Sequence, residues 1–154
     1  GRKGRPVTPM APDVQALAGR RGPAELIVRN GGGKKMQKIL IIINDAPYGT
    51  EKAYNALRMA MALQKDHGDK VEIKIFLLAD GVFCGVPGQN TPNGYYNIER
   101  MLRSVLQKGG EVKSCGGCSE ARGIGSIPLI ESVQLGNMQE FAQWTVACDK
   151  VMTF

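Results

Sequence analysis

The sequence contains few aromatic residues, which make up 6% of its 154 residues, and a single histidine, His67. His67 is the one histidine and lies far in sequence from the cysteine pair at 115 and 118, so we expect no catalytic Ser-His-Asp triad, which needs all three side chains together. No apolar run is long enough to cross a membrane, so we expect no membrane partner. The turn after the first predicted strand has no glycine-rich phosphate fingerprint, so a nucleotide cofactor is not supported.

The positive charge of the chain is unevenly distributed. Its formal net charge is +6, and residues 1–35 carry all of it, with eight Lys/Arg against two acidic residues. Residues 36–154 hold twelve basic and twelve acidic residues, and their aromatic residues do not alternate with basic ones. A nucleic-acid module needs a basic surface, so we expect no nucleic-acid partner for this part of the chain.

Residues 1–35 are rich in glycine, proline and arginine and show no sustained hydrophobic period. They end in Gly31-Gly32-Gly33 and two lysines, after which Met36 precedes a clean apolar run. We expect an N-terminal extension over 1–35 that is vector-derived or disordered, followed by one domain over 36–154. The alternative is a native basic tail that binds an acidic surface.

Five short apolar runs alternate with helical patterns from residue 36 onward, which predicts a single α/β domain with about five mostly parallel strands and helices on both faces. We predict a long unstructured connection over 80–93, a helical turn over 126–130, and Thr50 as the cap of the first helix. The predicted strands are 38–43, 71–78, 111–114, 132–135 and 150–153, and the predicted helices are 50–66, 94–108 and one capped by Asn137 with Glu140.

Three connections follow predicted strands, at 44–49, 80–93 and 115–123, and in a parallel sheet they should converge outside the carboxyl ends of the strands. Ligands collect at that edge, and a thiol there would be partly exposed and close to helix N-termini, which lowers its pKa. The candidate binding residues at this edge are Asn44, Tyr48, Gly49, Cys84, Gly116, Gly117 and Gly123.

Four cysteines without a secretion signal, Cys84, Cys115, Cys118 and Cys148, indicate a reducing, cytoplasmic location in which structural disulfides are not expected. Cys115 and Cys118 form a CxxC pair around two glycines. A zinc site needs about four ligands, and this single CxxC pair could be joined only by His67, Cys84 and Cys148, so we do not predict a metal site. A redox pair stays open, as does a buried structural role for both thiols.

The other two cysteines and Arg122 each allow a simple structural interpretation. We expect Cys148 to be buried near Trp144. Cys84 is either an exposed thiol in its loop or is buried beside Phe83 and Val86. Arg122 either orients an anion or stabilises a Cys115 thiolate. The alternative is an ordinary ion pair with Glu120 or Glu131.

Several motifs follow one another in a fixed order across residues 36–154, and together they resemble the DsrE/TusD-like superfamily of sulfur-relay proteins, most closely its YchN-like branch. The resemblance covers none of residues 1–35. The motifs are Met36–Ile39, Asn44–Gly49, Gly94–Ile98, Cys115-x-x-Cys118-x-x-x-Arg122-Gly123, Gln143-Trp144 and Asp149–Val151.

The resemblance implies a five-stranded α/β sandwich that assembles as a homo-oligomer, a trimer or a hexamer, in the cytoplasm. In the sulfur-relay members a cysteine ahead of an Arg-Gly pair carries a persulfide, and Cys115 matches it by its spacing to Arg122-Gly123. Cys118 would then be a resolving or assisting thiol and Arg122 an electrostatic helper. The function predicted is a persulfide carrier or sulfurtransferase without a cofactor, with sulfur donor and acceptor proteins as partners. A thiol–disulfide redox protein using both thiols, or a non-catalytic oligomeric binding module, is the alternative.

Overall fold

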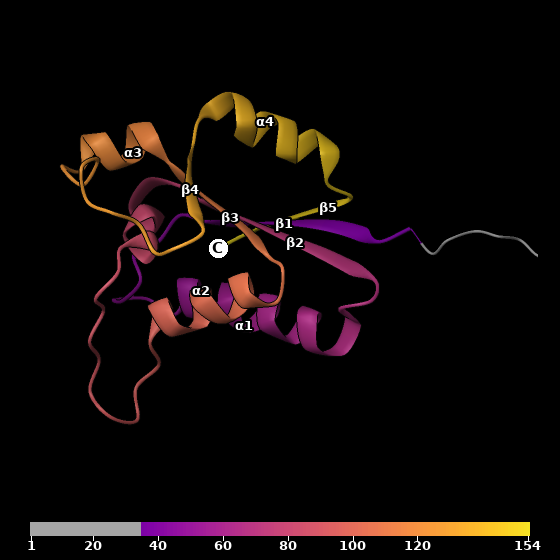
Figure 1. The fold of residues 1–154 in the computed structure, drawn as a ribbon, viewed down its shortest axis with the longest axis horizontal. Coiled ribbons are helices and arrows are strands. Elements are labelled where there is room, and N and C mark those ends of the chain that lie inside the picture. The colour runs from indigo at the N-terminus through magenta and orange to yellow at the C-terminus, as the bar shows by residue number, and fades with distance from the viewer. Residues whose placement is uncertain (1–34) are drawn as a thin grey trace, which may run out of the picture. The chain divides into compact units, whose positions relative to one another are not determined.

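The computed structural model describes residues 35–154, so the extension predicted over residues 1–35 lies, apart from Lys35, outside the described residues. Figure 1 shows the described elements, which alternate strands with helices along the chain. In chain order they are β1 (Gln37–Ile43), α1 (Lys52–His67), β2 (Val71–Leu77), η1 (Ala79–Gly85), α2 (Ile98–Gln107), β3 (Glu111–Cys115), α3 (Gly116–Ala121), β4 (Val133–Gly136), α4 (Met138–Ala147) and β5 (Lys150–Thr153).

The five strands form one parallel sheet in the order β4-β3-β2-β1-β5. Helices α1 and α2 cover one face of the sheet, whereas α3 and α4 lie on the other (Figure 1). The chain adds β2, β3 and β4 outward from β1 and then returns past β1 to place β5, so the helix that makes this return lies on the opposite face. The predicted single α/β domain with helices on both faces is confirmed.

Strand β1 is buried on both faces, because its side chains alternate between two hydrophobic clusters. Ile41 and Ile43 pack with α1 and α2 on one face, while Leu40 and Ile42 pack with Phe76 on the other. This alternation is the two-residue period of a strand, applied to a run that is apolar throughout. The continuous apolar run over 38–43 therefore correctly predicted a strand at this position.

Two helices begin at the caps that their sequences provide. The Asn137 side chain accepts the N–H of Glu140, whose carboxylate accepts the N–H of Asn137, so the predicted capping box of α4 is confirmed. Asn97 caps α2 in the same way by accepting the N–H of Arg100 at 2.9 Å. Because this cap ends the preceding loop, α2 begins at Ile98 and not at Gly94 as predicted.

The predicted start of α1 at Thr50 was wrong. Glu51 occupies the N-cap position, and Thr50 instead donates its hydroxyl to Asp45 at 2.9 Å. That hydroxyl still accepts the N–H of Lys52 at 3.4 Å, so Thr50 supports the first turn from one residue further out.

The connection over 80–93 is only partly irregular, because its first half forms the 3₁₀ helix η1. Gly81 anchors η1 to the end of β1: its N–H donates to the carbonyl of Asn44 at 2.9 Å, and a Cβ on it would lie 2.0 Å from the oxygen of Ile43. The predicted helical turn over 126–130 does not form, since residues 125–126 make only a turn. Pro128 disfavours a helical conformation at the residue before it.

None of the helices in residues 35–154 combines the length and the hydropathy that a bilayer crossing requires.

Candidate functional site

The three predicted connections meet at the carboxyl edge of the sheet. The backbone N–H of Gly81 joins η1 to Asn44, and the Cys84 thiol lies 3.8 Å from the carbonyl oxygen of Asp45. The Arg122 guanidinium then links α3 to Asp80 at the start of η1, with 2.7 Å between Nε and Oδ1. Residues far apart in sequence therefore form one surface around the end of β3.

Cys115 lies at the centre of this edge, where it is both the last residue of β3 and the N-cap of α3. The backbone N–H of Cys118 donates to the Cys115 sulfur at 3.4 Å. The Ser119 hydroxyl, buried below, donates to the Cys115 carbonyl at 3.0 Å and fixes the junction. The CxxC pair therefore lies at a strand-to-helix junction, where the sequence predicted only a connection over 115–123.

The two glycines between the thiols leave space beside the sulfur. A Cβ on Gly117 would meet nothing within 4 Å, and one on Gly116 would meet only the carbonyl oxygen of Gly136 at 3.5 Å, an ordinary contact. Neither residue has a positive φ. The backbone therefore does not require glycine at either position, and a side chain at 117 would find open space.

The surroundings of Cys115 favour its neutral thiol. The side chain is 8% exposed and belongs to the cluster of Leu40, Phe76 and Val82. Burial raises the pKa of Cys115, a side-chain hydrogen bond with Cys118 raises the pKa further, and the Cys118 N–H acts in the opposite direction. The predicted lowering of this pKa was wrong, because the apolar strands beneath the thiol outweigh the backbone donors.

Arg122 holds the site together through Asp80. Besides that ion pair, its Nη1 donates to the carbonyl of Cys118 at 3.2 Å, and neither hydrogen bond reaches the Cys115 sulfur. The pairing with Glu120 or Glu131 considered from the sequence was wrong. Asp80 was not predicted, and the only signal for it was its position directly after the second strand.

Gly123 has a structural role at the end of α3. Its φ is +70°, its N–H donates to the carbonyl of Glu120 at 3.0 Å, and the N–H of Ile124 donates to that of Ser119 at 3.0 Å. These bonds make a Schellman cap, which needs a left-handed residue and so favours glycine. Gly123, the glycine of the Arg-Gly pair, therefore ends the helix that Cys115 caps and that contains Cys118.

The other two cysteines, Cys84 and Cys148, differ in burial: Cys84 is buried and Cys148 is half-buried. Cys84 is fully buried, and burial raises its pKa to about 12. It packs in the cluster under α1 and α2, whereas Phe83 and Val86 pack on the other face, so the predicted neighbours were wrong. Cys148 is half-buried at the C-terminal cap of α4, where its N–H donates to the Trp144 carbonyl and its side chain packs against the cluster of Leu40 and Phe76. Its predicted position near Trp144 is confirmed, whereas its predicted full burial was wrong.

The polar candidates on the first connection bind other parts of the chain. The backbone N–H of Asn44 donates to the carbonyl of Phe154 at 3.0 Å. The Tyr48 hydroxyl donates to Gln89 at 2.8 Å and accepts the N–H of Ile98 at 3.3 Å, which ties the loop to α2. Gly49 has a φ of +108°, a conformation that glycine adopts readily. These contacts support the edge structurally and lie away from the sulfur.

The four cysteines of the described residues are free thiols. Within residues 35–154 no group of three or more His, Cys, Asp or Glu side chains gathers in a way that could hold a metal ion. The chemistry available at the edge is therefore that of two adjacent thiols with backbone N–H donors, namely nucleophilic attack on sulfur and disulfide formation.

Comparison with known proteins gives close relatives over the same residues. The protein YchN of Escherichia coli K12 is 44% identical over 119 residues, which cover 77% of this chain and all of YchN. An uncharacterised protein of Methanopyrus kandleri is 43% identical over 116 residues, covering 75% of this chain and 93% of that protein.

Solved structures agree with this relationship. The crystal structure of E. coli YchN matches with a TM-score of 0.72 at 44% identity, over 77% of this chain and all of that one. A conserved Bacteroides thetaiotaomicron protein of unknown function has a TM-score of 0.52 at 18% identity, over 77% of this chain and 95% of its own, and so shares the fold alone. The model of the DsrE/DsrF-like family matches residues 37–154, and the chain belongs to that family.

Proposed function

We propose that the protein accepts sulfane sulfur on Cys115 as a persulfide and passes it to an acceptor, acting as a sulfur carrier or sulfurtransferase. The observation that carries the proposal is the position of this thiol. It lies at the end of the inner strand β3, with the Cys118 N–H on its sulfur and open space at Gly117. Membership of the DsrE/DsrF-like family supports it. The free thiols fit a reducing compartment such as the cytoplasm.

The transfer proceeds without net oxidation. The Cys115 thiolate attacks the outer sulfur of a donor persulfide, the donor S–S bond breaks, and the donor cysteine leaves as a thiolate. A thiolate of the acceptor then attacks the outer sulfur on Cys115 and releases the Cys115 thiolate again. Donor and acceptor are expected to be proteins, since each must bring its own cysteine to the open side of the junction.

Intact-mass measurement of the reduced protein after incubation with polysulfide tests the proposal. We expect a gain of one sulfur atom, about 32 Da, that is lost in Cys115→Ser and kept in Cys118→Ser. Cys148→Ser is the matched control, since it removes a half-buried thiol away from the junction and should leave the gain intact. A gain that survives Cys115→Ser would contradict the assignment.

A thiol–disulfide redox function is the second candidate, and the placement of both thiols at one junction, with the Cys118 N–H 3.4 Å from the Cys115 sulfur, favours it. In that case both thiols lose their protons and two electrons to a disulfide donor, which is reduced to two thiols. Titration against glutathione redox buffers would then show a reversible loss of about 2 Da without sulfur uptake. That result would replace the carrier function with the redox function.

A further inference from the structure

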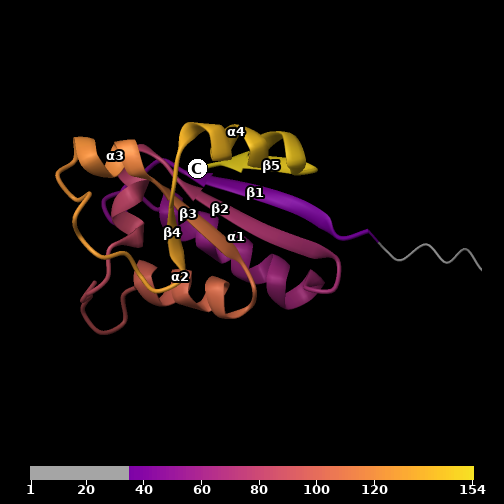
Figure 2. The ribbon, with the colours of Figure 1, turned by 45° about the horizontal axis from the view of Figure 1, so that its top comes forward.

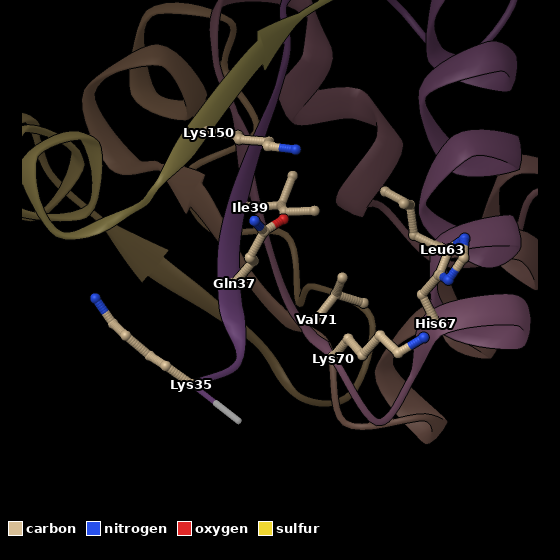
Figure 3. A pocket seen from close by; sticks show the side chains of 8 residues that line it. All are labelled: Lys35, Gln37, Ile39, Leu63, His67, Lys70, Val71 and Lys150. Carbon is tan, nitrogen blue, oxygen red and sulfur yellow. The ribbon is translucent and has the colours of Figure 1, made fainter. Parts of the chain in front are cut away.

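A cavity lies at the opposite end of the strands from Cys115. It has a volume of about 470 Å³ and is bounded by the first residues of β1, β2 and β5 and by the last turns of α1. Figure 3 shows side chains from these elements around it. No residue of the sulfur site lines this cavity, so an inference about it does not depend on the function proposed for Cys115.

The polar lining of the cavity is basic. His67, Lys70 and Lys150 line it together with Lys35, and no acidic side chain does. Lys35 already lies 3.7 Å from Asp149, and its ammonium group points away from the other lining residues in Figure 3. Within the described part of the chain, Lys70 and Lys150 have no acidic partner within salt-bridge distance.

The placement of these cations is not explained by the helix alone. The negative end of the α1 dipole accounts for a basic residue such as His67 in its last turn. It does not account for Lys70, which directly precedes β2, or for Lys150, which begins β5. In Figure 3 His67 and Lys70 lie on one side of the cavity and Lys150 lies on the other.

The remaining lining is largely apolar. Ile39 and Val71 come from neighbouring strands and are almost fully buried, and Leu63 faces them from α1. A concave site with an apolar wall and a few convergent polar groups is typical of small-molecule binding, and such sites span about 300–1,000 Å³. The cavity therefore has the size and the chemistry to take a ligand with an apolar body and a negative charge.

We propose that this cavity binds a small organic anion, with its charged group between the His67–Lys70 pair and Lys150 and its apolar body against Ile39, Leu63 and Val71. The shared chemistry is that of an aryl or alkyl carboxylate, sulfonate or phosphate. The anion supplies the negative charge that the lining lacks, and its body removes the apolar wall from water.

The dye 8-anilinonaphthalene-1-sulfonate has both features, and titration of the full chain by calorimetry and fluorescence tests the site. We expect one dye per chain, with affinity reduced about tenfold in Lys70→Gln and in Lys150→Gln, the loss of one charge-assisted hydrogen bond each. Lys65→Gln is the matched control, since Lys65 is exposed on the same last turns of α1 but does not line the cavity. Its affinity should be that of the unsubstituted chain.

Two further measurements distinguish binding in this cavity from binding of the dye on an exposed apolar surface. The uncharged dye N-phenyl-1-naphthylamine has the same aromatic body, and its binding should not respond to Lys70→Gln. Amide chemical-shift changes on adding the sulfonate should centre on Gln37, His67 and Val71. Absence of binding, equal affinity in all three lysine variants, or shifts centred on α4 would each overturn the proposal. A weaker affinity in Leu63→Ser, with the thermal midpoint checked separately, would support the apolar half of the site.

Discussion

At the scale of single residues, the Cys115 sulfur is subject to opposing effects from one neighbour. The backbone N–H of Cys118 lowers the pKa of Cys115, whereas its side chain raises that pKa through a hydrogen bond and through charge repulsion. Cys118→Ala removes the side-chain effects and keeps the N–H. The sequence identified both thiols. It could not reveal that the side chain and the backbone N–H of Cys118 shift the pKa of Cys115 in opposite directions, because both effects depend on the geometry of the junction.

We therefore predict that Cys118→Ala makes Cys115 react at lower pH. A raised pKa leaves less thiolate at a given pH, so lowering it moves the midpoint of iodoacetamide alkylation downward. The measurement is the alkylation rate of Cys115 against pH, followed by peptide mass spectrometry. Cys148→Ala, which removes a thiol that does not act on Cys115, should leave the midpoint in place. An upward shift in Cys118→Ala would contradict the prediction.

Cys84 provides a second test at this scale. The side chain is fully buried, and its pKa is raised to about 12, so at neutral pH it carries almost no thiolate and is closed to reagents. We predict that a thiol assay with dithionitrobenzoate does not detect Cys84 in the folded protein and detects it after unfolding in guanidinium chloride. In Cys84→Ala the folded count should be unchanged and the unfolded count lower by one thiol. Rapid modification of Cys84 in the native protein would mean that its loop opens.

At the scale of secondary structure, the elements that were predicted well are those whose pattern is local. The run from Lys38 to Ile43 and the capping box at Asn137 contain their own signals, and both formed where expected. Helix η1 was missed, because it depends on the close approach of Gly81 to the Ile43 carbonyl. The partner of Arg122 was missed for the same reason, since Asp80 reaches it only once η1 is in place.

The two positions Gly81 and Gly117 should respond to alanine in opposite directions. At Gly81 a Cβ would lie 2.0 Å from a backbone oxygen, so η1 must move away from β1, and we expect a loss of about 3 kcal/mol or more in unfolding free energy. At Gly117 the Cβ meets nothing within 4 Å, and alanine in a helix should add about 0.5–1 kcal/mol. Urea denaturation of both variants measures the difference. A neutral Gly81→Ala would show that η1 is not anchored as described.

Helix α4 is attached to the sheet differently from α1 and α2. Trp144 lies against two lysine side chains, with the ammonium groups of Lys74 and Lys113 at 4.8 and 5.1 Å from its ring. Lys113 also forms an ion pair with Glu140, the residue that closes the capping box. No residue of α4 is fully buried in the chain. Phe141 and Trp144 also pack on Phe76, with ring centroids 4.7 and 6.1 Å away. Aromatic, ionic and cation–π contacts therefore hold the helix at one side, and its other apolar side chains stay outward.

At the scale of the whole molecule, this outward surface continues onto the edge strand β5. Figure 2 shows α4 lying along β5 on the face opposite α1 and α2. On α4, Val146 is 88% exposed and Met138 is 60% exposed, and Val151 of the edge strand β5, which pairs with Leu40 and so faces the same side of the sheet, is 43% exposed. Apolar side chains gathered in this way are typical of an interface between proteins. We propose that the chain self-associates through α4, in line with the trimer or hexamer expected from its family resemblance.

Light scattering coupled to size exclusion tests this assembly directly. We predict a mass of several chains for the unsubstituted protein and a shift toward the monomer in Met138→Glu with Val146→Glu, because a carboxylate in an apolar interface loses its hydration without gaining a partner. Both positions are exposed in the chain, so the variant should keep its fold by circular dichroism. Met59→Glu is the matched control, since Met59 is 43% exposed on α1, on the far side of the sheet. A monomeric unsubstituted protein would contradict self-association, and equal dissociation in the control would place the interface elsewhere.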